Sequence, residues 1–135
     1  MPYNVIDIEG IGSTYAAKLE VHGIKTTSDL LQKAGTKAGR EVLAAGSKLP
    51  ESLILTWVNH ADLMRINGIA GQTAELLEAA GVDTVKELAT RNAANLHTKL
   101  QEVNNQFGLS GRVPSMEMLA DMIEAAKNLE PKVFH

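Results

Sequence analysis

The sequence predicts an all-α protein that contains two copies of one helical unit. Its apolar residues recur at intervals of three and four and almost never alternate strictly, which is the spacing of helices rather than of strands. Residues that favour helix ends, chiefly Ser, Thr, Pro and Gly, bound these segments at short intervals. A stretch of 17 residues near the start occurs again in similar form past residue 65, so we expect the unit to be duplicated.

The duplicated stretch reads IEGIGSTYAAKLEVHGI at residues 8–24 and INGIAGQTAELLEAAGV at residues 66–82. The two copies align without a gap at a spacing of 58 residues, and TTSDL after the first copy matches TVKEL after the second at the same spacing. We therefore predict that repeat one covers about residues 4–61 and repeat two about residues 62–129.

The spacing lengthens further along the chain, where LTWVNHADL at 55–63 resembles ADMIEAAKN at 120–128 about 65 residues later. The added residues fall in NNQFGLSGRVP at 104–114. This segment is rich in Asn, Gly and Pro and is predicted to be a loop, which is where insertions are tolerated.

Capping residues set the expected helix boundaries, because Ser, Thr and Asn favour the start of a helix, Pro its first turn and Gly its end. In the first copy, one helix is expected to begin at Ser13 or Thr14 and to end at Gly23, and the next to begin at Thr26. A third is expected between Thr36 and Gly46, and Pro50 opens a longer helix that reaches about Arg65. In the second copy they are Gly81, Thr84, Asn92 and Ser115, the last of which opens a helix from Met116 to about Leu129.

The order of the elements suggests how the two repeats share a core. The second copy is preceded by the whole helix at 50–65, whereas the first is preceded only by MPYNVIDIE. We expect the C-terminal helix at 116–129 to fold back and complete repeat one, as 50–65 completes repeat two. Residues 1–135 would then form a single domain with a pseudo-twofold arrangement, since two separate cores this small would be marginal.

Composition narrows the classes of function. The chain of 135 residues is 44% apolar, contains no cysteine and has a net charge of −3, so disulfides and thiolate chemistry are excluded. The first 50 residues carry six basic and five acidic side chains, and the remainder seven and eleven. A protein that mainly binds phosphate groups usually carries more basic than acidic side chains. No secretory signal or membrane span of about 20 apolar residues is recognised, so we expect a cytoplasmic protein that does not bind membranes.

The repeated stretches resemble a known motif. Ile8-Glu9-Gly10-Ile11-Gly12 with Ala16, Leu19 and Gly23 is similar to the helix-hairpin-helix motif, as is the second stretch around Gly68. LLEAAGVDTVKELA at 76–89 also resembles the C-terminal domain of the bacterial RNA polymerase alpha subunit. Over nearly the whole chain, the tandem pattern is most similar to a bacterial family, domain of unknown function 4332. The resemblance to this family implies a fold for the chain, but it implies no activity.

The first hairpin is a candidate phosphate site. Gly10 and Gly12 permit positive φ and leave the main-chain amides uncovered, and a helix from Ser13 would present its positive end to an anion. Ile11 would point into the core, and Lys18 could supply charge, with Lys25, Lys37 and Arg40 as further sources. Helix-hairpin-helix proteins typically hold the nucleic-acid backbone here, so the resemblance implies that role for Gly10, Ile11 and Gly12.

The second hairpin departs from this pattern. Its turn is formed by Gly68, Ile69, Ala70 and Gly71, so alanine replaces the second glycine, and the following helix is acidic. Two interpretations of the turns stay open. The first is that the turns are anion cradles in the sense just described. The second is that packing alone requires glycine between two helices, and that Asp7 and Glu9 repel a phosphate at the first turn.

No catalytic arrangement is recognised, and GIGSTYAAK lacks the ending of a P-loop. We expect no metal site and no cofactor, because the four histidines are scattered and His60 and Asp62 do not share a helix face. Trp57 is expected in the core. We therefore predict a non-enzymatic binding module whose partner is an unidentified protein or a second copy of the chain. The alternative is sequence-independent binding of the DNA or RNA backbone through the first hairpin.

Overall fold

A computed structural model describes residues 3–135 and confirms the all-α prediction: these residues form eight α-helices and one short 3-10 turn, and no strand. Only Asn4 and Thr26 make an isolated β-type bridge within this range. The elements are the 3-10 turn Val5–Asp7, α1 (Ser13–Val21), α2 (Thr27–Ala34), α3 (Lys37–Ser47), α4 (Glu51–Leu63), α5 (Gly71–Ala79), α6 (Val85–Leu88), α7 (Ala93–Phe107) and α8 (Met116–Lys127).

Polar side chains begin five of the helices, as the sequence predicts. In α2, α3, α6, α7 and α8, the side chain of the capping residue accepts a hydrogen bond from the amide three residues later, which satisfies one of the free donors at the helix start. These capping residues are Thr26, Thr36, Thr84, Asn92 and Ser115. The first helix differs from the expectation, because Gly12 is its cap and Ser13 its first helical residue.

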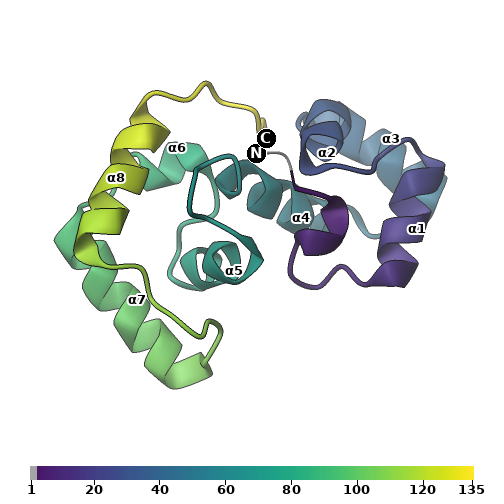
Figure 1. The fold of residues 1–135 in the computed structure, drawn as a ribbon. Helices are drawn as coiled ribbons and strands as arrows, with labels where there is room; N and C mark the ends of the chain where they lie inside the picture. The colour runs from purple at the N-terminus through teal and green to yellow at the C-terminus, as the bar shows by residue number, and fades with distance from the viewer. Residues whose placement is uncertain (1–2) are drawn as a thin grey trace.

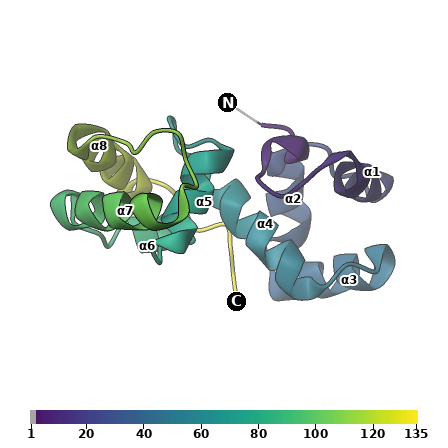
Figure 2. The same cartoon turned by 90° about the horizontal axis from the view of Figure 1, so that it is seen from below.

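Helix α4 runs between the two halves of the molecule (Figures 1 and 2). It packs against α2 and α3 on one side and against α5 on the other. Its residues from Trp57 to Met64 are all buried. Trp57 is 1% exposed and its ring centroid lies 5.0 Å from that of Tyr15, so its predicted place in the core is confirmed.

The buried apolar side chains form one continuous cluster that extends from Val5 to Ala126. It includes side chains from the turns, such as Ile11 and Ile69, as well as from the helices that follow them. Both halves of the chain therefore contribute to one core, through α4.

The position of α8 differs from the sequence-based expectation. The main contacts of α8 are with α6 and α7, so this helix packs within repeat two and does not complete repeat one. Within residues 4–61, it is α4 that packs on α2 and α3. The loop at 108–115 brings α8 back against α7, and the apolar face around Leu119 and Ile123 is buried there. Only the chain after α8 returns to repeat one.

Candidate binding sites at the two glycine turns

The two glycine turns have the same local backbone. Gly10 and Gly68 have φ of +90° and +93°, values that favour glycine. In each turn, the amide of the next residue donates to the carbonyl three residues back, over 3.1 Å from Ile11 to Ile8 and 3.1 Å from Ile69 to Ile66. The helices that follow end in the same way, with positive φ at Gly23 and at Gly81.

The second glycine of the first turn does not use its conformational freedom. Gly12 has a φ of −93° and ψ of −172°, and Ala70 has a φ of −105° and ψ of −172°. Both values lie in the extended region that any residue adopts. The second turn therefore has the same local backbone as the first, although alanine replaces the second glycine.

Helices α1 and α5, which follow the turns, have no side-chain cap. Gly12 and Ala70 carry no polar side chain, so the first three amides of each helix have no hydrogen-bond acceptor among residues 3–135. These amides belong to Ser13, Thr14 and Tyr15 in α1, and to Gly71, Gln72 and Thr73 in α5. Each helix start therefore has the unpaired donors and the positive dipole end that favour an anion in general.

The first turn is open, and Lys18, the first cation predicted for it, lies away from it. A Cβ atom added at Gly10 or at Gly12 would meet nothing within 4 Å. Ile11 is 5% exposed, which confirms that its side chain points into the core. Lys18 is exposed but belongs to the last turn of α1, so its Cα lies about 7 Å along the axis from the start of the helix.

The two turns touch each other. A Cβ atom added at Gly71 would lie 2.5 Å from the carbonyl oxygen of Asp7 and 3.4 Å from Cγ of Glu9. Gly71 is buried by this contact. The sequence suggested that Glu9 would repel an anion at the first turn, but its side chain packs toward the start of α5, at the second turn.

A groove runs along the second turn, between that turn and α8. It consists of two adjoining hollows of about 440 Å³ and 350 Å³, which share Gly68 and Met118. We call it the second-hairpin groove. Its lining residues are Glu9, Ile66, Asn67, Gly68, Ala70, Gly71, Gln72, Thr73, Ser110, Gly111, Arg112, Pro114, Met118, Asp121, Met122 and Ala125.

Charges of opposite sign lie toward the two ends of the second-hairpin groove. Arg112 lines one hollow together with the first residues of α5 and with Glu9, and Asp121 lines the other. Met118 lies where the two hollows meet and is 38% exposed. Sequence reasoning missed Arg112, because it lies in the inserted loop and no motif singles it out.

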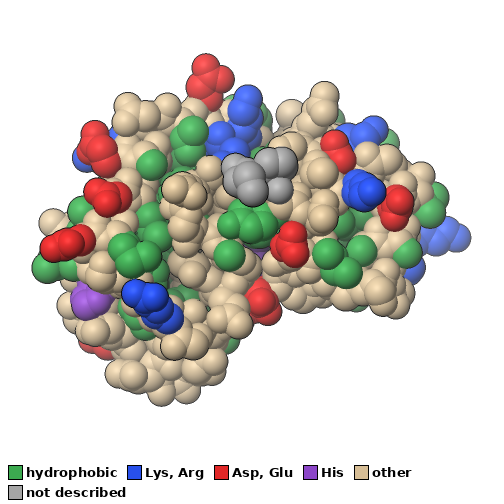
Figure 3. All heavy atoms as spheres, viewed as in Figure 1, with side chains coloured by type: hydrophobic (Ala, Val, Ile, Leu, Met, Phe, Trp, Pro, Cys, Tyr) green, Lys and Arg blue, Asp and Glu red, His purple; other side chains and the backbone are tan. Residues whose placement is uncertain are grey.

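Basic and acidic side chains are interspersed over the face in Figure 3, and no broad basic patch covers it. Arg40, which the sequence offered as a source of positive charge near the first turn, is 2% exposed and therefore does not reach solvent. Its guanidinium donates to the carbonyl oxygens of Ala34 and Gly35 at the end of α2. Arg40 therefore supplies no positive charge to the first turn.

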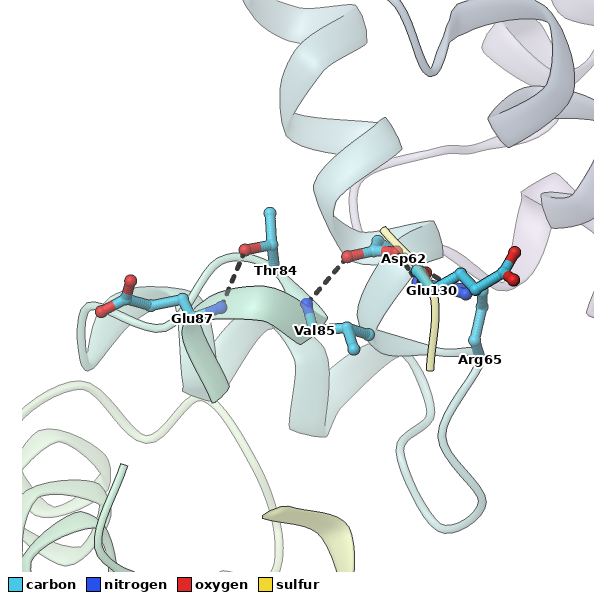
Figure 4. A network of polar contacts seen from close by, with 6 residues as sticks. All are labelled: Asp62, Arg65, Thr84, Val85, Glu87 and Glu130. Atoms are coloured by element: carbon cyan, nitrogen blue, oxygen red, sulfur yellow. Dashed lines mark hydrogen bonds and ion pairs between the residues drawn. The ribbon is translucent and has the colours of Figure 1, made fainter. Parts of the chain in front are cut away.

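A buried carboxylate holds the end of α4 against the start of α6 (Figure 4). Asp62 is 2% exposed and accepts hydrogen bonds from Nε and Nη2 of Arg65 over 2.9 and 2.7 Å and from the amide of Val85 over 2.8 Å. In repeat one the amide of Thr27 makes the corresponding bond to the carbonyl of Tyr3 over 2.8 Å. These contacts are structural, since every oxygen of Asp62 has a partner.

The histidines form no metal site. No group of three His, Asp or Glu side chains within residues 3–135 is placed to hold a metal ion. His60 is 2% exposed, and its Nε2 lies 3.1 Å from Oε2 of Glu78, which links α4 to α5. Among the same residues, no helix combines the length and the hydrophobicity that a transmembrane span requires.

Comparison with protein families gives one match. Residues 9–129 match the family described as a domain of unknown function (DUF4332), which covers most of the chain. The protein belongs to this family. Comparisons with curated proteins and with solved structures gave no match. Membership in DUF4332 therefore agrees with the resemblance seen in the sequence and assigns no activity to the chain.

Proposed function

We propose that this DUF4332 protein is a non-enzymatic binding module and that it binds a protein partner through the second-hairpin groove. The observation that carries the proposal is Met118, which lies at the junction of the two hollows and is exposed. Methionine side chains are flexible and polarizable, and they adapt to apolar side chains of a partner. We also infer that both turns are helix-hairpin-helix motifs, which their common backbone supports.

The groove offers more than an apolar contact. The amides at the start of α5 and the guanidinium of Arg112 favour a neutral acceptor such as a carbonyl group at one end, where Glu9 disfavours a full negative charge, and Asp121 favours a basic group at the other. A partner segment with an apolar residue between a carbonyl acceptor and a basic residue would complement these features. Such a segment could come from another protein or from a second copy of this chain.

The test compares two charged substitutions on the same helix. Met118→Glu places a carboxylate in the groove, whereas Met116→Glu makes the same change at a residue that is 50% exposed and outside the groove. The full chain and both variants would be used as bait in the source cells, with bound proteins identified by mass spectrometry. We expect at least one protein to be lost with Met118→Glu and retained with Met116→Glu.

Light scattering of the same three proteins separates the two sources of the partner. A dimer that only Met118→Glu dissociates would identify a second copy as the partner. If every captured protein and every oligomer tolerates Met118→Glu, the second-hairpin groove is not a protein-binding site.

The second candidate function is binding of the nucleic-acid backbone at the first turn. It is favoured by the start of α1, where three amides have no acceptor among the described residues and where Gly10 and Gly12 leave open space. Phosphate oxygens fit such a site without any reading of bases. Against it stands the absence of a broad basic patch on the face in Figure 3.

Fluorescence anisotropy with labelled double-stranded and single-stranded DNA tests this candidate at low and near-physiological salt. Gly12→Glu is a clean probe, because the φ of −93° and the open space accept a side chain without strain. Ala45→Glu, on an exposed position of α3, is the matched charge control. Salt-sensitive binding that Gly12→Glu abolishes and Ala45→Glu retains would support the candidate, and no binding at low salt would exclude it.

A further inference from the structure

The chain beyond α8 crosses from repeat two to repeat one (Figure 1). Three hydrogen bonds hold it there. Nη2 of Arg65 donates to the carbonyl oxygen of Glu130 over 2.9 Å, the amide of Phe134 donates to the carbonyl oxygen of Gly35 over 2.7 Å, and Nη2 of Arg40 donates to the carbonyl oxygen of Phe134 over 2.7 Å. The segment 130–134, which we call the tail, thus lies against the end of α2.

Main-chain atoms of the tail make all three of these bonds. The carbonyl oxygen of Lys132 also approaches Gly35 so closely that a Cβ atom at Gly35 would collide with it. Among the tail side chains, Val133 packs against the core, whereas Phe134 is 52% exposed. The surface that holds the tail therefore recognises an extended backbone with one apolar side chain, and little else of the tail's sequence.

Arg40 at the end of this surface is only partly satisfied. Its Nη1 donates to the carbonyl oxygens of Ala34 and Gly35 over 3.1 and 2.9 Å, and its Nη2 donates to Phe134. Its Nε is buried and has no hydrogen-bond partner among residues 3–135. A buried donor without an acceptor destabilises the arrangement that leaves it so.

The unpaired Nε and the bonded Nη2 form one edge of the guanidinium. Arg65 uses the same edge to hold the carboxylate of Asp62, where both nitrogens donate to Oδ1. At Arg40 the carbonyl oxygen of Phe134 accepts from Nη2 alone and leaves Nε without a partner, and this carbonyl belongs to the amide that joins Phe134 to His135. A carboxylate would bring a second oxygen, which could accept from Nε in the paired geometry that arginine prefers for carboxylates.

We propose that Arg40 and the end of α2 form a docking site for a peptide with a free C-terminal carboxylate. The carboxylate takes the place of the carbonyl of Phe134 and accepts hydrogen bonds from both Nε and Nη2 of Arg40. The residue before the last one supplies the apolar side chain at the place of Val133. In the structure the tail of the same chain occupies this site, and it offers Arg40 the one carbonyl oxygen of Phe134 instead of the two oxygens of a carboxylate. This site is separate from the second-hairpin groove, so either proposal can fail without the other.

The first experiment creates the carboxylate within the chain. A chain that ends at Phe134 places a terminal carboxylate on the edge of Arg40, whereas His135→Ala keeps the amide and removes only the His135 side chain. We expect the unfolding midpoint temperature to rise by about 5 °C in the shortened chain and to stay unchanged in His135→Ala. Equal midpoints for the shortened chain and the full chain would overturn the proposal.

The second experiment supplies the carboxylate in trans and does not depend on a variant of Arg40 that could fail to fold. Phe134→Pro in the full chain removes the amide that holds the tail to Gly35 and leaves the site itself intact. The probes are two fluorescein-labelled peptides with the sequence EPKVF, one with a free carboxylate and one with a terminal amide. We expect the acid to bind about tenfold more tightly than the amide. Equal affinities, or no binding of the acid, would overturn the proposal.

Discussion

The carboxylate of Asp62 accepts a hydrogen bond from the main-chain amide of Val85 and so joins the end of α4 to the start of α6. The same carboxylate is paired with Arg65, which in turn holds the carbonyl of Glu130. One buried group therefore connects three segments that are distant in the sequence. The position of α6, and of α8 packed on it, depends on this connection.

Asp62→Ala is expected to lower the free energy of unfolding by about 3 kcal/mol, because it leaves the amide of Val85 and the guanidinium of Arg65 without their acceptor. Asp62→Asn should recover part of the loss, since its carbonyl oxygen can still accept from Val85. Urea denaturation followed by the fluorescence of Trp57 measures both. Glu124→Ala, which removes an exposed pair with Lys127, is the control and should change the stability by less than about 0.5 kcal/mol.

Much of the fold could be predicted from the sequence, because helix caps and helical spacing are local signals. Thr26, Thr36, Thr84, Asn92 and Ser115 begin helices in the structure as their sequence context indicates. The placement of the last helix could not be predicted in this way. Its apolar face would suit either repeat, and the choice depends on which helices the loop at 108–115 lets it reach.

The same holds for the candidate sites: features that depend on a single residue could be predicted, and features that depend on residues far apart in the sequence could not. The turn at Gly10 was recognised from its glycine, because positive φ is a property of one residue. The burial of Arg40 was missed, because it depends on contacts with Phe134, which is 94 residues away. Arg112 and Met118 were not recognised as neighbours of the second turn for the same reason: the loop that brings them there has no sequence pattern.

Asp29 gives a prediction about pH. Hydrogen bonds from the amides of Thr26 and then Lys25 hold the pKa of its carboxyl below the ordinary value. The charged form is thus favoured in the folded state, and its contribution is present at neutral pH and lost as the pH falls through the folded pKa. Asp29→Asn should destabilise the protein at pH 7, and the difference from the unaltered chain should shrink at acid pH.

Urea denaturation of both chains at a series of pH values measures this difference, and an NMR titration of the carboxyl gives its pKa directly. A difference in stability that stays constant from pH 7 into the acid range would show that the capping bonds do not depend on the charge. Glu41→Gln compared with the unaltered chain is a suitable control, because the side chain of Glu41 is exposed and makes no hydrogen bond among the described residues.

The two positive φ values at Gly10 and Gly68 predict a cost for alanine at these positions. An L-residue at such a φ is strained, so Gly10→Ala and Gly68→Ala should each lower the free energy of unfolding by about 1 kcal/mol or more. Gly12→Ala is the matched control, because its φ is negative and the space around it is open, and it should leave the stability unchanged or raise it. Thermal unfolding by circular dichroism distinguishes these outcomes.

The contact between the two turns predicts both the sign and the magnitude of the stability change that Gly71→Ala causes. Gly71 is the first residue of α5, where alanine would normally stabilise the helix. Here the added Cβ would lie 2.5 Å from the carbonyl oxygen of Asp7, so Gly71→Ala should separate the turns and cost about 1–3 kcal/mol. Ser13→Ala, at the equivalent exposed position of α1, is the control and should change the stability by less than about 0.5 kcal/mol. If Gly71→Ala instead stabilises the protein in urea denaturation, the two turns are not packed together in solution.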